Sequence, residues 1–178
     1  MGKDEKEVLY GILSERNIKQ VQFGIDKRFP SWYGSNAYFN LDSKSLGYKE
    51  DMKIPRKVEE TQYWLDTLHV CEYCFKYSDD EEEFIVHEAN CIYKKRPPGK
   101  IVYKSPKYTI RRVKGSKHQL FCQCLCLFTK LFLDNKSMYF KVDHYEFYIV
   151  YETGFNKPMA FFSKDLVSYQ QNNLACVL

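Results

Sequence analysis

The chain has 178 residues and a mass of 21.3 kDa, enough for one ordinary domain and too little for two of typical size. Hydrophobic residues make up 44% of the sequence and charged residues 28%, which predicts a buried core and argues against intrinsic disorder. No apolar run reaches the roughly 20 residues that cross a bilayer, so we expect no membrane partner. The charged N-terminus lacks the apolar stretch of a signal peptide, which predicts a reducing compartment.

The net charge of +4 is unevenly distributed along the chain. Residues 92–133, which we call the basic belt, contain eleven lysine and arginine residues and no aspartate or glutamate. Such a belt favours an anionic partner, for example a nucleotide cofactor or nucleic acid. A solvated basic surface without a partner explains the charge equally well.

The N-terminal part of the chain predicts few regular elements. Residues 7–13 are expected to form a short helix or strand, and residues 18–24 alternate well enough to predict a strand. Residues 41–60 are polar and charged, which is typical of a surface excursion.

The C-terminal part predicts strands with one buried helix among them. Residues 108–113 and 118–121 are expected to pair as a hairpin that turns at Gly115–Ser116. Residues 120–133 are apolar nearly all round, which predicts a buried helix. Three later segments are aromatic or β-branched and predict strands: residues 139–151, 159–162 and 173–178. This order of elements predicts an α+β domain.

The strongest chemical signal is the spacing Cys71-x₂-Cys74-x₁₂-His87-x₃-Cys91. A Cys-x₂-Cys turn and a His-x₃-Cys pair on one helix supply the four ligands that tetrahedral zinc prefers. All four positions come from protein, so the predicted site is structural and has no open place for a catalytic water. The alternative is that these are unrelated core residues.

The residues around this spacing carry carboxylates, which would be repelled by a DNA duplex. These are Asp79, Asp80, Glu81, Glu82, Glu83 and Glu88. We therefore expect the metal unit to hold the fold together rather than to contact bases.

A second cluster, Cys122-Gln-Cys124-Leu-Cys126, resembles a metal site at first sight. Alternate residues of a helix point in different directions and do not close one site. Free cysteine is also a common buried residue, so core packing is favoured over metal binding.

Several motifs occur in an order that resembles the MYST family of histone lysine acetyltransferases. The central stretch is most similar to the SAS-type silencing acetyltransferases of budding yeasts. Beside the metal spacing, the motifs are Gln22-Phe-Gly24, Trp32-Tyr33, Arg96-Pro-Pro-Gly99, the run 121–136, Phe161-Phe-Ser-Lys164 and Asn173-Leu-Ala-Cys176.

The resemblance implies an α+β fold in which a C2HC zinc finger precedes the first half of a GNAT-like acetyltransferase core. That core is a mixed sheet with a buried central helix. It further implies three parts: residues 1–66 from the start of the family's domain, residues 67–99 as the zinc finger, and residues 100–178 as the incomplete acetyl-coenzyme A-binding core.

The activity that the resemblance implies is acetyl transfer from acetyl-coenzyme A to a lysine amine of a histone tail, with histone four expected. The implied setting is chromatin silencing and transcription regulation in the nucleus. The implied partners are nucleosomal histone tails and accessory subunits of a small nuclear complex. Direct DNA contact through the basic belt is compatible with its charge.

Residue by residue, the resemblance places the zinc ligands at Cys71, Cys74, His87 and Cys91. It places the autoacetylated lysine at Lys136 and the active-site cysteine at Cys176, with backbone contacts to the co-substrate at Val177 and Leu178. Without the resemblance, Lys136 is a lysine near a helix C-terminus and Cys176 a small core residue.

The sequence departs from the family at its end. The pyrophosphate-binding Gly-x-Gly loop and the general-base glutamate would follow Leu178, so we expect the 178 residues alone to be inactive. The final strand is expected to lack a neighbour, which predicts poor folding of this piece by itself. The alternative function is a non-enzymatic zinc-binding module that contacts chromatin or nucleic acid.

Overall fold

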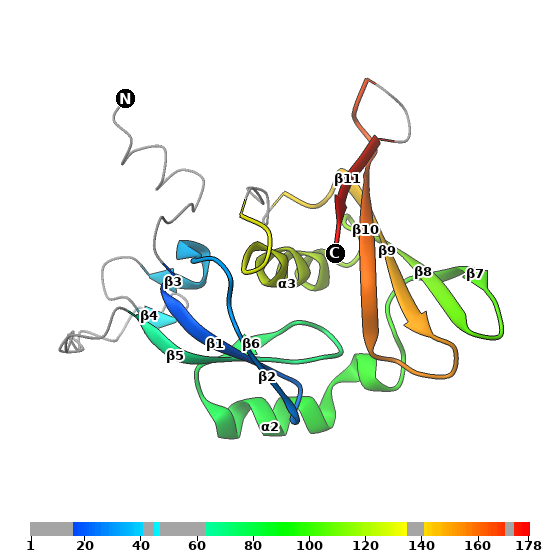
Figure 1. Ribbon diagram of the computed structural model, residues 1–178. Coiled ribbons are helices and arrows are strands. Elements are labelled where there is room, and N and C mark those ends of the chain that lie inside the picture. The colour runs from blue at the N-terminus through cyan, green and yellow to red at the C-terminus, as the bar shows by residue number, and fades with distance from the viewer. Residues whose placement is uncertain (1–15, 41–44, 47–62, 135–140, 170–172) are drawn as a thin grey trace.

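The computed structural model of the chain describes residues 16–40, 45–46, 63–134, 141–169 and 173–178. Within these ranges the chain forms two α-helices and three sheets (Figure 1). The helices are α2 (Glu81–Asn90) and α3 (Gln119–Lys130), and the 3-10 helices are η1 (Asn36–Tyr38) and η2 (Ile92–Lys94). Neither described α-helix has the length and hydropathy of a membrane-crossing segment.

The first large sheet has four strands in the order β2-β1-β5-β6. Its strands are β1 (Ile18–Phe23), β2 (Lys27–Pro30), β5 (Leu65–Val70) and β6 (Tyr77–Ser78). β1 and β5 run parallel, and the other two pairings are antiparallel. A separate antiparallel pair is formed by β3 (Phe39–Asn40) and β4 (Ser45–Leu46).

The second large sheet has five strands in the order β11-β10-β9-β8-β7. Its strands are β7 (Lys100–Lys104), β8 (Tyr108–Lys114), β9 (Tyr145–Glu152), β10 (Pro158–Asp165) and β11 (Asn173–Val177). All its described pairings are antiparallel. The parallel pairing described above, between β1 and β5, belongs to the four-stranded sheet.

Helix α3 lies between the two large sheets and forms the centre of the core (Figure 1). Its residues from Phe121 to Lys130 are buried except one, which explains why its apolar pattern shows no polar face. Phe128 stacks on Phe23 of β1, with ring centroids 4.9 Å apart. On the other side, Ile149 of β9 and Phe161 of β10 are buried in the same core. The predicted α+β fold with a buried central helix is confirmed.

Most predicted elements of the C-terminal part are confirmed. The predicted helix over 120–133 is α3, and the segments 159–162 and 173–178 fall in β10 and β11. The strand predicted over 139–151 starts only at Tyr145 within the described residues. The strand predicted over 18–24 is β1. Residues 7–13 and nearly all of 41–60 lie outside the described residues.

The predicted hairpin between residues 108–113 and 118–121 is wrong. β8 pairs with β7 and β9, and residues 118–121 begin α3. Gly115 allows this because an added Cβ would lie 1.7 Å from the carbonyl oxygen of Val142, so the chain passes too closely there for a side chain. The turn residues were therefore identified correctly, but they join a strand to a helix.

Candidate metal centre

Two of the predicted ligands, Cys71 and Cys74, lie in the tight turn that follows β5, which we call the metal turn. The amide of Phe75 donates to the carbonyl of Cys71 at 2.9 Å, and Phe75 itself has a positive φ of 64°. The amide of Tyr73 points at the sulfur of Cys71 (3.4 Å), and the amide of Lys76 points at that of Cys74 (3.5 Å). Backbone donors of this kind orient thiolate ligands and stabilise their charge.

The other two ligands lie at the end of α2. The side chain of Asp80 caps this helix by accepting a hydrogen bond from the amide of Glu83 at 3.0 Å. His87 is in the last turn of the helix, and Cys91 is the residue at its C-cap. Spacing by four residues brings both side chains to one face, directed at the turn after β5.

The structure brings all four predicted ligands together. Their ligand atoms all lie within 4.8 Å of one another, and the sulfur of Cys74 is 3.2 Å from Nε2 of His87. Bonds of about 2.3 Å to sulfur and 2.0 Å to nitrogen would separate tetrahedral ligand atoms by about 3.5–3.8 Å. The three cysteines are buried and His87 is half-buried, so one ion fits within the group without a place for solvent.

Burial and crowding control the protonation of these groups. Hydrogen bonding to Cys74 and burial raise the pKa of the Cys71 thiol, and burial also raises the pKa of Cys91. Burial lowers the pKa of His87, which favours the neutral imidazole that ligates metals. A metal ion bound here would therefore displace protons from the thiols, so occupancy depends on pH.

Glu72 lies between the two turn cysteines and is buried, although the sequence pattern alone suggested nothing about it. Its carboxylate accepts one hydrogen bond from Lys27 of β2 (2.8 Å) and forms an ion pair with Lys157 of the β9–β10 turn (2.7 Å). Gly24 approaches it so closely that an added Cβ would lie 2.6 Å from the carboxyl carbon. Glu72 therefore joins the metal turn to both large sheets.

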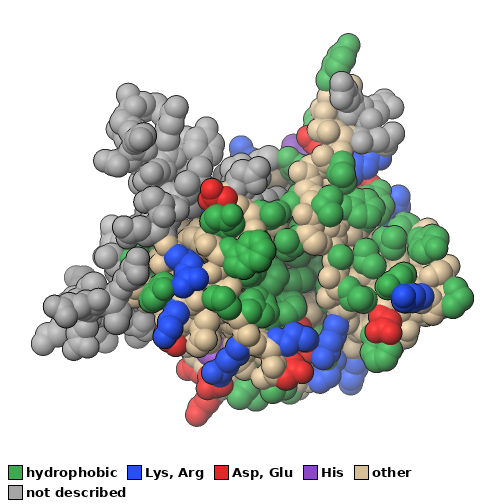
Figure 2. Space-filling view, in the orientation of Figure 1, with side chains coloured by type: hydrophobic (Ala, Val, Ile, Leu, Met, Phe, Trp, Pro, Cys, Tyr) green, Lys and Arg blue, Asp and Glu red, His purple; other side chains and the backbone are tan. Residues whose placement is uncertain are grey.

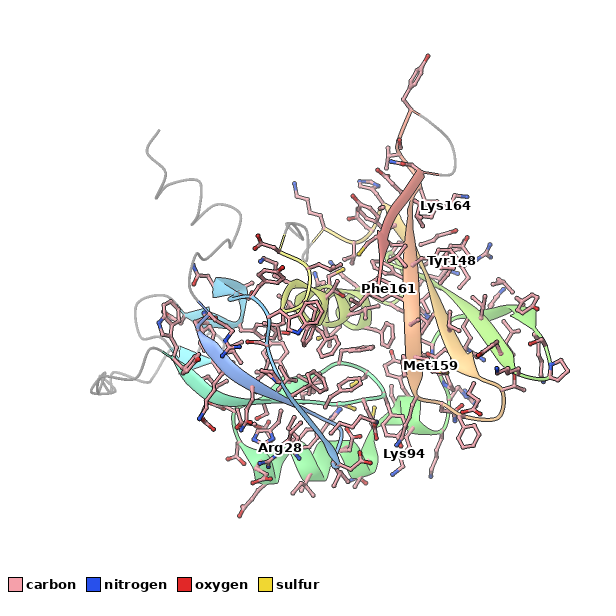
Figure 3. All side chains as sticks on the ribbon, viewed as in Figure 1. Arg28, Lys94, Tyr148, Met159, Phe161 and Lys164 are labelled. Carbon is pink, nitrogen blue, oxygen red and sulfur yellow. The ribbon has the colours of Figure 1, made fainter. Side chains whose placement is uncertain are left out.

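One of the carboxylates near the metal ligands is buried rather than exposed to solvent. Glu88 on α2 is buried, and burial raises the pKa of its carboxyl group. Arg28 of β2 pairs with Glu81 at 3.5 Å and is labelled beside the helix in Figure 3. The exposed acidic groups are thus concentrated at the N-terminal end of α2, and Glu88 is not one of them.

The other predicted site residues lie on the five-stranded sheet or outside the described residues. Cys176 of β11 is half-buried and opposite Ser163 of β10. Val177 is exposed, and the amide and carbonyl of Leu178 form a pair of hydrogen bonds with Phe161, which is labelled in Figure 3. Lys136 lies outside the described residues. Cys176 is not part of the four-ligand group.

The cysteines of α3 do not form a metal site within the described residues. Cys122, Cys124 and Cys126 are all buried in the core around α3. Burial raises the pKa of Cys124 to about 11 and also raises that of Cys122, so both thiols are neutral. Core packing, the interpretation favoured from the sequence, agrees with their position.

Comparison with known proteins identifies relatives over nearly the whole chain. Residues 96–178 match the model of the MOZ/SAS family. The histone acetyltransferase SAS2 of Saccharomyces cerevisiae is 70% identical over 176 residues, which cover 99% of this chain and 52% of that protein. The histone acetyltransferase MOF of Drosophila melanogaster is 41% identical over 63% of this chain and 14% of its own length.

A third relative is the histone acetyltransferase ESA1 of Gibberella zeae, 31% identical over 92% of this chain and 28% of its own length. The chain therefore spans about half the length of the SAS2 relative and smaller shares of the other two. Both the metal-ligand region and the five-stranded sheet lie within the SAS2 match, because that match leaves out almost none of the chain.

Proposed function

Because the chain belongs to the MOZ/SAS family, we propose that it forms part of a histone acetyltransferase that transfers acetyl groups from acetyl-coenzyme A to lysine amines. The observation that carries this proposal is a match over 99% of the chain to a relative whose name states that activity. We assign the substrate to a histone tail, with histone four expected, and the setting to chromatin silencing and transcription regulation in the nucleus. Accessory subunits of a nuclear complex are the expected further partners.

Zinc is the metal that we assign to Cys71, Cys74, His87 and Cys91. Three thiols and one imidazole form a donor set suited to zinc, and the spacing of the ligand atoms supports tetrahedral binding. The ion would be structural, since the four protein ligands leave no open coordination position. It would join the turn after β5 to the end of α2, which are otherwise connected by the short strand β6 and the cap of α2.

The acetyl-transfer chemistry is assigned to the β11 end of the five-stranded sheet. A lysine amine is mostly protonated at neutral pH and must lose a proton before it attacks a thioester. Cys176 is the proposed active-site thiol, and Val177 and Leu178 are the proposed backbone contacts to acetyl-coenzyme A. Both covalent transfer through the thiol and direct attack by the lysine are compatible with this placement.

Two further assignments complete the proposal. We assign autoacetylation to Lys136. We divide the chain into residues 1–66 at the start of the family's domain, residues 67–99 as the zinc finger, and residues 100–178 as the first half of the acetyltransferase core.

Labelled acetyl transfer by the intact protein tests this proposal. With nucleosomal histones as acceptor, we expect time-dependent transfer of label from acetyl-coenzyme A, and Cys176→Ala should reduce it. The matched control is Cys122→Ala, which removes a thiol from the core helix and should change stability more than the rate per folded molecule. Absence of both acetyl-coenzyme A binding and transfer would favour the alternative, a non-enzymatic zinc module.

A further inference from the structure

A cavity of about 720 Å³ opens where the chain after α2 meets the five-stranded sheet. Three segments form its walls: residues 92–100, strand β8, and the turn that leads into α3. Among the described residues, its lining contains seven lysine and arginine residues and no aspartate or glutamate. These seven are Lys95, Arg96, Lys100, Arg111, Arg112, Lys114 and Lys117. Folding therefore gathers much of the basic belt around one hollow.

The wall of the cavity is held in place by one of these cations. The guanidinium of Arg111 donates to the carbonyls of Pro98 and Gly99, each at 3.0 Å. Gly99 has a φ of +78°, and an added Cβ would lie 2.2 Å from the carbonyl oxygen of Arg112, so only glycine fits. The loop that carries Lys95 and Arg96 is thereby fixed against β8 before any ligand binds.

No carboxylate in the described part of the chain pairs with the remaining cations. Among the residues that the structure describes, no salt bridge joins any of the seven to an acidic side chain. Glu146 lies opposite Lys114 in the strand register, but it is buried and accepts a hydrogen bond from Tyr148 at 3.0 Å. The positive charge is therefore available to an external anion.

The surroundings of the cavity strengthen its positive potential. His118 lines it and is also the N-cap of α3, where no side chain caps the helix and no acidic residue lies in the first turn. The unpaired amides of a helix N-terminus attract anions. The exposed carboxylates lie in the first turn of α2. This ten-residue helix separates them by about 15 Å from its C-terminal end, where the cavity wall begins. That exceeds the screening length of about 8 Å at physiological salt, so they do not neutralise the cavity.

We propose that this cavity binds the phosphate backbone of a DNA duplex, at a site separate from the metal centre and from acetyl transfer. A duplex carries one charge per about 1.7 Å of its axis, so one bound stretch neutralises several of the seven cations at once. A single small anion would leave most of them unpaired. Tyr93 is the one Phe, Tyr or Trp among the described lining residues, and its half-buried ring makes a T-shaped contact with Phe121 at 5.5 Å. The cavity therefore lacks the series of exposed aromatic rings on which successive single-stranded bases stack.

Duplex binding by the intact zinc-loaded protein, measured without acetyl-coenzyme A by fluorescence anisotropy, tests this proposal. The cavity variant is Lys95→Ala/Lys117→Ala, in which both side chains are exposed. The matched control is Lys104→Ala/Lys107→Ala, which removes the same charge from exposed positions of the basic belt that do not line the cavity. Thermal melting of the parent and of both variants establishes that all three proteins are equally folded.

Each phosphate contact contributes about 0.9 to the slope of log affinity against log salt concentration. The cavity variant should therefore lose about 1.8 from the slope and on the order of 50-fold in affinity at 0.1 M salt. The control should change the slope by less than half of that. Equal losses in both variants would overturn the proposal, because the belt would then bind diffusely. The proposal would also be overturned if the parent bound polyglutamate or single-stranded DNA more tightly than the duplex and Lys95→Ala/Lys117→Ala removed that preference.

Discussion

Replacement of Glu72 by glutamine tests whether one buried carboxylate holds the metal turn against both large sheets. Glu72→Gln keeps the size of the side chain and removes its charge. In the folded protein this carboxylate is only 6% exposed and lies 2.8 Å from Lys27 and 2.7 Å from Lys157. The amide would leave two lysines beside a group that no longer neutralises them.

The magnitude follows from how far each partner is buried. Removal of one partner from a fully buried ion pair costs about 3–5 kcal/mol. The two lysines here are 49% and 47% exposed, so water screens both pairs and stabilises the lysines after the charge is lost. We therefore expect Glu72→Gln to lower the free energy of unfolding by about 2 kcal/mol.

Chemical denaturation of the zinc-loaded protein, followed by tryptophan fluorescence, measures this loss. The control is Asp66→Asn, because the pair between Lys19 and Asp66 has a similar length of 3.1 Å but is 55% and 67% exposed. The control should cost less than about 1 kcal/mol. Equal losses in the two variants would refute the argument that burial of Glu72 makes its ion pairs important.

The same pair predicts a dependence on pH. The hydrogen bond to Glu72 raises the pKa of Lys157 above its ordinary value of 10.5. A raised lysine pKa stabilises the fold below that ordinary value, and this contribution disappears as pH rises through the value in the folded protein. The stability difference between the parent and Glu72→Gln should thus be constant up to about pH 9 and shrink above about pH 10.5. A difference that grows in that alkaline range would contradict this assignment.

Three further experiments test other parts of the structure. Gly24→Ala should cost about 2–3 kcal/mol because it adds a clash with Glu72 to a positive φ, whereas Gly154→Ala, with open space around it, should cost about 1 kcal/mol; unfolding curves measure both. A chelator should remove one zinc per chain, measured by a colorimetric metal indicator, and lower the melting temperature; full stability after removal would contradict a structural role. Phe128→Ala should cost about 3–5 kcal/mol because its ring contacts three other aromatic rings, and Ile92→Ala, at an exposed position, should cost less than about 0.5 kcal/mol.

The sequence was sufficient to predict features whose signals are local. Four ligands at fixed spacing within 21 residues predicted the group that the structure brings together. The helix α3 was predicted because a long apolar run without turn residues has few other ways to be buried. The turn at Gly115 was located because glycine and serine are common turn residues, although the element that follows it was assigned wrongly.

Features that depend on distant partners were not predictable from the sequence alone. Strand β7 consists wholly of exposed residues, so no apolar alternation marks it, and only its pairing with β8 makes it a strand. Glu72 resembles any surface carboxylate until Lys27 and Lys157 approach it from two sheets. The charge of the basic belt was plain, but nothing in its order indicated that seven of its cations surround one cavity.

The sequence by itself determined that a metal-ligand set, a buried helix and an acid-free basic segment are present, since each depends on neighbouring residues and short-range geometry. Tertiary structure decided which carboxylates are buried, which cations converge and which strands pair. These outcomes depend on contacts between residues far apart in the chain, whose entropic cost of closure is offset only when the whole core forms at once.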